Sequence, residues 1–282
     1  MELNPIYYIA KKEFLDNVRN KWVIIITIIF TALTLLASYA GSIFSSGWQD
    51  LAGTISNMMA LVQYLISIIA LILGYSAIIG EIEKGSMNSL LSLPTTRNEI
   101  LLGKFIGLGT ILTVAILIGF GIAGAIIGLN VENVNYGEYL FFIAASIFMA
   151  LIFLSIGLFL STVFKKRSTA MGGAIFIWVF FAIIWIFIVA AVIVASNTME
   201  NLEAGEDIEL PEAYFTSTFF NPLSCYSSLI QLNIGSTDSA ALEQIGVTTP
   251  DYINSTNMFI AMCIWLFSFL ILAFWRFKQR DI

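Results

Sequence analysis

Histidine is absent from this chain of 282 residues, and cysteine is scarce. Without histidine the protein cannot build a histidine-ligated haem, a histidine-containing zinc site or a Ser–His catalytic pair. The only cysteines, Cys225 and Cys263, have no spacing typical of a metal site. The sequence also has no GxxxxGK[ST] motif, so it has no phosphate loop of its own. We therefore expect a chain that is not an enzyme and binds no cofactor.

Charge is the second scarce property. Charged residues make up 11% of the chain and hydrophobic residues 59%, whereas soluble globular proteins carry about 25% charged residues. Apolar runs recur that exceed the roughly 18 residues indicating a membrane helix. Backbone polar groups must pair within each span, so the spans are expected to be helices. The prediction is an all-α polytopic membrane protein with a single membrane domain over residues 1–282.

Six membrane-spanning helices are predicted, at residues 22–40, 58–80, 104–129, 139–164, 170–195 and 258–275. Residues 1–21 contain a predicted helix at the membrane interface, because five apolar residues fall on one side of it; these are Ile6, Tyr7, Ala10, Phe14 and Val18. A solvated N-terminal extension is the alternative. Residues 196–257 form a long extracytoplasmic segment, in which we expect one or two short helices that dip toward the outer interface.

Basic residues predict the orientation. All 13 lysines and arginines lie on one side of the predicted spans, and segments 41–57, 130–138 and 196–257 contain none. Positive charge is typical of cytoplasmic loops, so both termini are expected in the cytoplasm. We expect a multi-pass protein of a prokaryotic cell membrane.

The predicted spans contain no Asp, Glu, Lys or Arg away from their ends. Such residues mark proton relays and ion pathways in membranes, so their absence argues against a proton-coupled carrier and a channel with a charged filter. A self-contained secondary transporter is a weaker alternative, because we see no inverted repeats. A membrane scaffold or membrane enzyme is another, although no catalytic group of residues supports the enzyme.

Two possible cation sites stay open. Carboxylates are concentrated in the outer segment, where they serve solubility or bind a cation or an accessory protein; the calcium candidates are Glu200, Glu203, Glu206 and Asp207. Sulfur side chains near span ends either pack or bind copper(I); they are Met58, Met59, Met258, Met262 and Cys263. Packing and solubility are the simpler explanations.

The polar loop at residues 81–103 separates two predicted spans and has its own local order. Ser86 can cap a short helix, Pro94 ends it, and Thr96 and Glu99 form a capping-box pattern that starts the next helix. Three apolar residues of the short helix share one face at i, i+3 and i+4; they are Met87, Leu90 and Leu91. We expect this face to be exposed, although an ordinary connector resting on the lipid surface is the alternative.

The motifs of this loop resemble the permease subunits of type-2 ABC exporters. The matching residues read E-x-E-x-G-S, then L-L-S-x-P, then R and G-K; they are Glu81, Glu83, Gly85, Ser86, Leu90, Leu91, Ser92, Pro94, Arg97, Gly103 and Lys104. Ser86 departs from the commoner threonine. The N-terminal stretch and Asn221-Pro222 are also similar to the opening helix and the outer re-entrant region of that family, so the resemblance covers most of the chain.

The resemblance implies a coupling helix at residues 86–92 that contacts a separate ABC ATPase subunit, where ATP and Mg²⁺ would bind. The residues implied in this coupling are Glu81, Glu83, Gly85, Ser86, Met87, Leu90, Leu91, Pro94, Arg97 and Lys104. It also implies a second permease copy, with a homodimer the simplest form, and export of a substrate that the sequence does not identify. Contact with membrane lipid is expected, and nucleic-acid binding is not.

Overall fold

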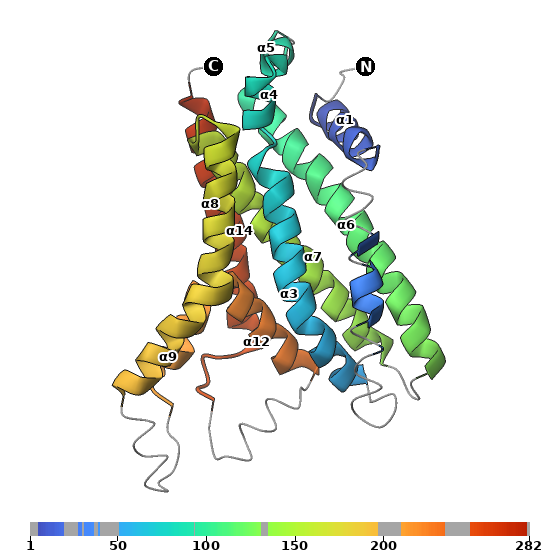
Figure 1. The fold of residues 1–282 in the computed structure, drawn as a ribbon, viewed down its shortest axis with the longest axis vertical. Helices are drawn as coiled ribbons and strands as arrows, with labels where there is room; N and C mark the ends of the chain where they lie inside the picture. Colours follow the sequence, from blue (N-terminus) through green and yellow to red (C-terminus); the bar gives the residue numbers. More distant parts are fainter. Residues whose placement is uncertain are drawn as a thin grey trace, which may run out of the picture.

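The computed structural model describes residues 5–19, 28–29, 31–36, 39, 51–92, 94–130, 135–196, 210–234 and 249–280. Within these ranges every regular element is a helix (Figure 1). The elements are α1 Pro5–Val18, α3 Leu51–Tyr75, α4 Ile79–Glu83, α5 Ser86–Leu91, α6 Arg97–Asn130, α7 Tyr136–Val163, α8 Arg167–Val179, the π-helix η1 Phe180–Ile184, α9 Trp185–Ala195, α11 Glu212–Ser217, the 3₁₀-helix η2 Thr218–Phe220, α12 Pro222–Ile234 and α14 Ser255–Lys278.

Five helical segments in the described ranges are long and apolar enough to cross a membrane. They are Met58–Glu83, Arg97–Ile126, Tyr136–Val163, Arg167–Ala195 and Ser255–Lys278. These segments correspond to the second to sixth predicted spans, so the all-α polytopic class is confirmed. The first predicted span, residues 22–40, lies largely outside the described residues, and its described parts at 28–29, 31–36 and 39 are helical.

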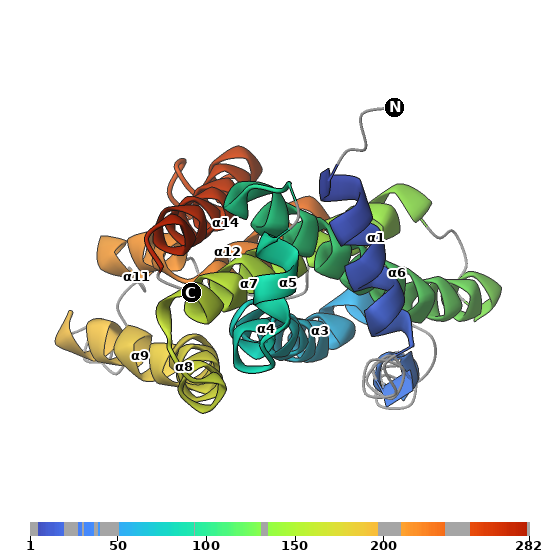
Figure 2. The ribbon, with the colours of Figure 1, turned by 90° about the horizontal axis from the view of Figure 1, so that it is seen from above.

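The bundle is built around α7, which lies between α3 and α14 (Figure 2). Of the 18 consecutive residues of α7 with the highest hydropathy, 72% are buried, the largest share among the five membrane-spanning segments. A Cβ added to Gly74 of α3 would lie 2.8 Å from the carbonyl oxygen of Leu154, and one added to Gly157 would lie 2.9 Å from the Cα of Gly74. The two glycines therefore allow the α3 and α7 backbones to touch.

Helix α1 lies across the start of α6 (Figure 2). Its buried residues are Ile9 and Glu13, while two members of the predicted apolar stripe, Tyr7 and Val18, are 59% and 40% exposed. The helix thus contacts the protein through Ile9 and Glu13 and leaves Tyr7 and Val18 exposed, whereas the other three residues of the stripe are partly buried. Helix α1 lies within residues 1–21, where the interfacial helix is predicted; its position at a membrane interface stays a prediction.

The segment that corresponds to the fifth predicted span is interrupted by the π-helix η1, which the apolar pattern did not indicate. Asn221, at the start of α12, donates a hydrogen bond from Nδ2 to the carbonyl oxygen of Phe181 in η1, at 3.0 Å. Its Oδ1 accepts from the backbone N–H of Leu223 at 2.9 Å. Asn221 therefore ties the outer segment to the π-helix, whose irregular backbone leaves carbonyl groups to be satisfied.

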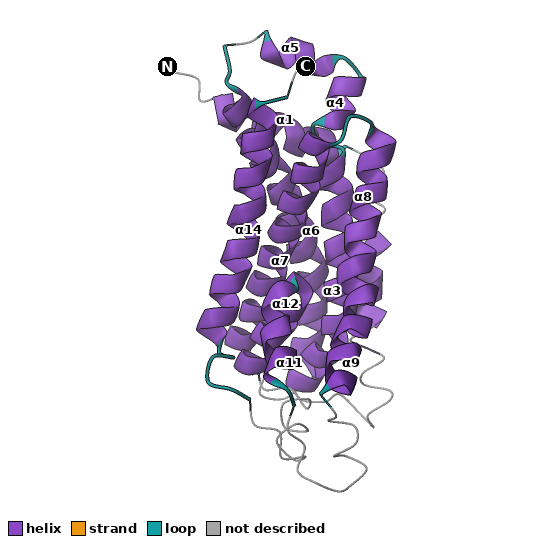
Figure 3. Cartoon of the chain, turned by 90° about the vertical axis from the view of Figure 1, so that its left-hand side faces the viewer, coloured by secondary structure: helices purple, strands orange, loops and turns teal. Residues whose placement is uncertain are grey.

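Short helices occur in the outer segment, as predicted. Helix α12 packs against α14 and α7 (Figure 3), and its Tyr226 hydroxyl lies 2.8 Å from the Ser146 hydroxyl of α7 in a fully buried pair. A buried tyrosine keeps its hydroxyl paired, which fixes the position of α12 in the bundle.

Both described chain ends, together with α4 and α5, lie at one end of the bundle (Figure 1). The described lysines and arginines lie in or directly after α1, in the α4–α6 connection and the first turns of α6, at the α7–α8 junction, and in or just after the last turn of α14. These segments all meet at that end, which we call the basic end. Helices α9 and α11 lie at the opposite end.

Candidate functional site

The connection from α4 through α5 to α6 forms the outermost part of the basic end (Figure 3). Gly85 separates α4 from α5 with φ at +73°, a left-handed conformation that favours glycine. Thr95 donates a hydrogen bond from its hydroxyl to the carbonyl oxygen of Leu90 at 3.2 Å, closing the end of α5. The result is a separate short helix held by a defined turn on each side.

Helix α6 begins with the predicted capping box. The Thr96 backbone N–H donates to Glu99 Oε2 at 2.6 Å, and the Glu99 backbone N–H donates to the Thr96 hydroxyl at 3.3 Å. This reciprocal pair satisfies two N–H groups that a helix start otherwise leaves open. The exit from α5 is therefore fixed by local sequence.

Helix α4 is fixed to the bundle by α7 and α8. The Ser161 hydroxyl of α7 accepts hydrogen bonds from the backbone N–H groups of Ile78 and Ile79, each at 2.9 Å. At the other end of α4, Glu83 Oε1 accepts from the backbone N–H of Arg167, the first residue of α8, at 2.7 Å. Movement of α4 relative to the bundle would break these bonds.

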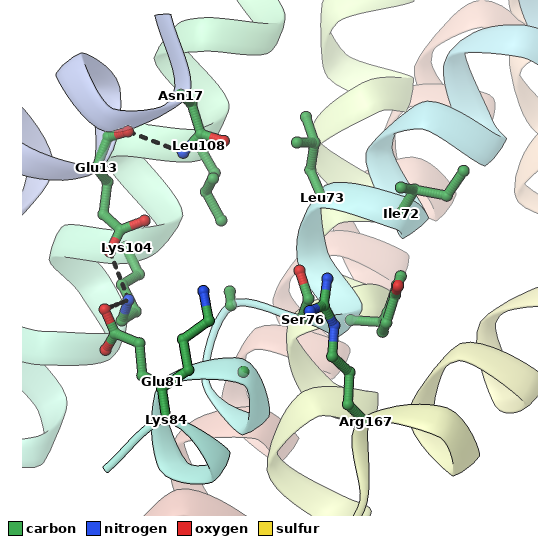
Figure 4. A pocket seen from close by; sticks show the side chains of 13 residues that line it. Glu13, Asn17, Ile72, Leu73, Ser76, Glu81, Lys84, Lys104, Leu108 and Arg167 are labelled. Carbon is green, nitrogen blue, oxygen red and sulfur yellow. Dashed lines mark hydrogen bonds and ion pairs between the residues drawn. The ribbon is translucent and has the colours of Figure 1, made fainter. Parts of the chain in front are cut away.

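A buried charge cluster joins α1, α4 and α6 (Figure 4). Lys104 of α6 is 1% exposed, and its Nζ lies 2.5 Å from Glu13 Oε1 of α1 and 2.9 Å from Glu81 Oε1 of α4. Burying an unpaired ammonium group costs roughly several kcal/mol of folding free energy. Two carboxylates meet that need here, and the more exposed Lys12 lies 3.7 Å from Glu81. We call Glu13, Glu81 and Lys104 the lysine cluster.

At the basic end, two arginines donate hydrogen bonds to backbone carbonyl groups at the carboxyl ends of membrane helices. Arg97 Nη1 lies 3.0 Å from the carbonyl oxygen of Phe277 near the end of α14, and Arg280 Nη2 lies 2.8 Å from that of Phe164, directly after α7. Cations at helix C-termini pair with free carbonyls and with the helix dipole. The start of α6 is thereby bound to the last helix.

The chain matches a known transporter family over nearly its whole length. The family described as ABC-2 family transporter protein matches residues 7–282. The chain belongs to the ABC-2 transporter family. It is also 32% identical over 286 residues to the probable ABC transporter permease protein NosY of Stutzerimonas stutzeri, covering 99% of both chains, and 30% identical over 284 residues to the protein of the same name from Pseudomonas aeruginosa, covering 98% of this chain and 99% of the relative.

The predicted coupling residues of this ABC-2 permease fall into three groups. Glu81, Glu83, Arg97 and Lys104 form the fixed contacts described above. Gly85, Ser86 and Pro94 are exposed in the α4–α6 connection. The third group consists of the apolar residues of α5. Of these, the structure describes the side chains of Met87 and Leu90.

The expectation of an exposed apolar face on α5 is wrong for Met87. Its side chain is fully buried and joins the same apolar cluster as Ile79 and Ile100. Leu90 is partly buried and packs against that cluster, while the Leu91 side chain lies outside the described residues. The spacing indicated correctly that these residues share a face, but the α4 and α6 residues of the same chain offered a burial site for it. Whether these residues contact an ATPase stays a prediction.

Sequence reasoning missed Glu13, Ser161 and Arg280 as parts of the site. Glu13 and Lys104 are 91 residues apart, and Ser161 is 83 residues from Ile78. No local pattern marks either pair. The one available signal was the position of Lys104 at the start of a predicted span. A lysine that is buried there requires an acidic partner.

The possible cation sites receive no support from the described residues. Met58, Met258 and Met262 are fully buried in the apolar core, and no group of three His, Cys, Asp or Glu in the described ranges could hold a metal. The calcium candidates at 200–207 lie outside the described residues.

Proposed function

We propose that this ABC-2 permease couples ATP hydrolysis by a separate ATPase subunit, which binds ATP and Mg²⁺, to export of a substrate across the membrane. One observation carries the proposal: α5 forms the outermost part of the basic end, and the adjoining helix α4 is linked to α1, α6, α7 and α8. A force applied to α5 would reach α4 and α6 directly, and through them α1, α7 and α8. The absence of a phosphate loop from the sequence makes a separate ATPase necessary.

The base of α5 is suited to transmit such a force. Lys104 connects α6 with α4 and α1, Ser161 connects α4 with α7, and Glu83 connects α4 with α8. Each link is a hydrogen bond or ion pair, so a displacement of α4 would strain or break the contacts that hold it against its neighbours. This supports a role for the lysine cluster in positioning α5, without a catalytic part.

The proposal places the basic end in the cytoplasm, where the ATPase has access to ATP. The described basic residues gather there, and positive charge is typical of cytoplasmic loops. Both described chain ends lie at this end too (Figure 1). Helices α9 and α11 would then face the outside of a prokaryotic cell membrane.

A second copy of the chain is proposed to pack against the segment α8–η1–α9. Only 6% of its most apolar window of 18 residues is buried within one chain, against at least 33% for the other four segments. Large side chains such as Phe176 and Phe187 remain exposed there. A homodimer would cover this face and provide two coupling helices for two ATPase subunits.

The test is co-purification with the ATP-binding subunit expressed together with the permease. Ser86→Arg places a bulky cation at an exposed position of α5. We expect the recovered ATPase to fall at least tenfold, which corresponds to losing about 1.4 kcal/mol of binding free energy. Ser168→Arg is the matched control, because Ser168 is an exposed serine at the same end, on α8. Leu90→Asp is unsuitable because it would also disturb the packing of α5 on its own chain.

The amount of permease in the membrane fraction is measured for both variants, since Ser86→Arg removes only a 3.3 Å bond to the Glu81 carbonyl oxygen. Equal ATPase recovery with Ser86→Arg and Ser168→Arg would show that α5 is not the contact.

A further inference from the structure

A pocket of 290 Å³ opens at the basic end, between α1 and α6 on one side and α3, α4 and the start of α8 on the other (Figure 4). Its charged lining residues are Glu13, Glu81, Lys84, Lys104 and Arg167. Its apolar wall includes Ile72, Leu73 and Leu108 from the ends of two spans. The pocket therefore presents a polar rim next to an apolar surface at the edge of the membrane.

The rim carries two cations that no described residue pairs with. Lys104 is paired with Glu13 and Glu81. The side chains of Lys84 and Arg167, by contrast, have no ion pair or hydrogen bond with any described residue, and Arg167 contributes only its backbone N–H to Glu83. Figure 4 shows the Lys84 side chain extending from the turn after α4, and the Arg167 side chain extending from the start of α8, into the pocket. Two free cations converging on one space favour an anion such as a phosphate group.

The rim also offers an acceptor. Glu81 uses Oε1 for Lys104, whereas its Oε2 is buried and has no hydrogen-bond partner among the described residues. Buried carboxylate oxygens are normally paired. A ligand that also pairs with Glu81 Oε2 therefore carries a hydrogen-bond donor close to its anionic group.

The apolar wall distinguishes a lipid from a small anion. Ile72 is 42% exposed, and it lies with Leu73 on the last turns of α3, a segment long enough to span the membrane. Inorganic phosphate would leave this surface in contact with water. The acyl chains of a membrane lipid would cover it, and basic pockets beside membrane helices are known to bind lipid headgroups.

We propose that this pocket binds one glycerophospholipid from the leaflet at the basic end. Its phosphate lies between Lys84 and Arg167, its headgroup amine or hydroxyl donates to Glu81 Oε2, and its chains lie against Ile72 and Leu73. The proposal rests on this pocket alone and does not depend on ATPase coupling.

The test is native mass spectrometry of the full-length protein after delipidation in mild detergent. Phosphatidylethanolamine, phosphatidylglycerol, phosphatidylcholine and inorganic phosphate are titrated separately. We expect one phosphatidylethanolamine or phosphatidylglycerol per chain, and several-fold weaker binding of phosphatidylcholine, whose choline group has no hydrogen-bond donor. Lys84→Met/Arg167→Met should weaken lipid binding roughly 25-fold, at about fivefold per cation.

Lys165→Met/Lys166→Met is the matched control. It removes the same charge from exposed residues next to Arg167 that do not line the pocket, and it should bind lipid like the wild type.

Equal loss of lipid binding in both double variants, or no loss in either, would overturn the site. Equal binding of phosphatidylcholine would overturn the role of Glu81. Binding of inorganic phosphate without lipid would overturn the lipid assignment. Lys84 and Arg167 are exposed, so folding should survive, and unfolding temperatures of all variants check this.

Discussion

At the scale of single residues, Lys104 determines whether α1, α4 and α6 stay together. It is buried with two carboxylates, and neither carboxylate has another cation at comparable distance in the described ranges. Lys104→Met would leave Glu13 without a cation partner among the described residues and Glu81 with only the more distant Lys12. We expect the free energy of unfolding in detergent micelles to fall by roughly 3 kcal/mol, the lower end for breaking a buried pair, because the carboxylates keep 11% and 17% exposure.

Lys12→Met is the control for this prediction. Lys12 also approaches Glu81, but at 3.7 Å and with 48% of its side chain exposed. Exposed ion pairs contribute about 1 kcal/mol or less. If both variants lost the same stability in denaturant titrations, the lysine cluster would not be the link between the three helices.

Residue-level contacts were predictable only where they are local. The capping box was visible because Thr96 and Glu99 are three residues apart and the motif has a fixed geometry. The partners of Lys104 were not, because the sequence gives no distance between α1 and α6. Met87 shows a second limit. Helical spacing indicates which residues share a face, but not whether the same chain or a partner covers it.

At the scale of helices, α1 and α6 meet through Gly103 and Gly107. A Cβ added to Gly107 would lie 2.7 Å from the Ala10 carbonyl oxygen and 2.7 Å from the Glu13 Cβ. Gly107→Ala should therefore push α1 away and lower the free energy of unfolding by about 1–3 kcal/mol. A spin-label pair at the exposed residues Lys11 and Thr110 should report a longer distance between the helices.

Gly121→Ala on the same helix is the matched comparison. No described atom lies within 4 Å of a Cβ placed there, so the substitution should be neutral or stabilise α6 by up to about 1 kcal/mol through helix propensity. A Gly107→Ala protein as stable as Gly121→Ala, with an unchanged spin-label distance, would contradict close packing of α1 on α6.

The glycine pattern also shows what an isolated motif can indicate. Gly103-x-x-x-Gly107 predicts close approach of another helix, and the structure identifies that helix as α1. The Gly124-x-x-x-Gly128 pattern instead accommodates tyrosine side chains from α7; they belong to Tyr139 and Tyr136. Small residues leave space for a neighbour, but the fold determines which neighbour occupies it.

At the scale of the whole molecule, hydropathy predicted the ends of the second to sixth spans to within three residues, because long apolar runs have few alternatives in a membrane. The exception is the start of the third span, where α6 begins at Arg97, seven residues before the predicted start. It did not predict the π-helix in the fifth span. The extra residue in that turn is favoured by the hydrogen bond from Asn221, which lies 40 residues away in the chain. Irregular backbone of this kind depends on contacts that a local pattern does not contain.

The proposed homodimer is tested by disulfide crosslinking in native membranes. Phe176→Cys on α8 should form a crosslinked dimer, because the α8–η1–α9 segment is proposed to face its copy. Ile264→Cys on α14 is the control, since both side chains are close to equally exposed, at 62% and 63%. Crosslinking through Ile264 and not Phe176 would place the dimer interface elsewhere. The native Cys225 and Cys263 are replaced by serine or alanine in both variants.

The proposed function requires α5 of this ABC-2 permease to contact an ATPase. The most direct measurement is photocrosslinking in native membranes, with a photoreactive amino acid at Ser86 or at Ser168 and the ATP-binding subunit expressed together with the chain. We predict a crosslinked product that contains the ATP-binding subunit from Ser86, and little or none from Ser168. A product of equal yield from both positions, or from Ser168 alone, would contradict the claim.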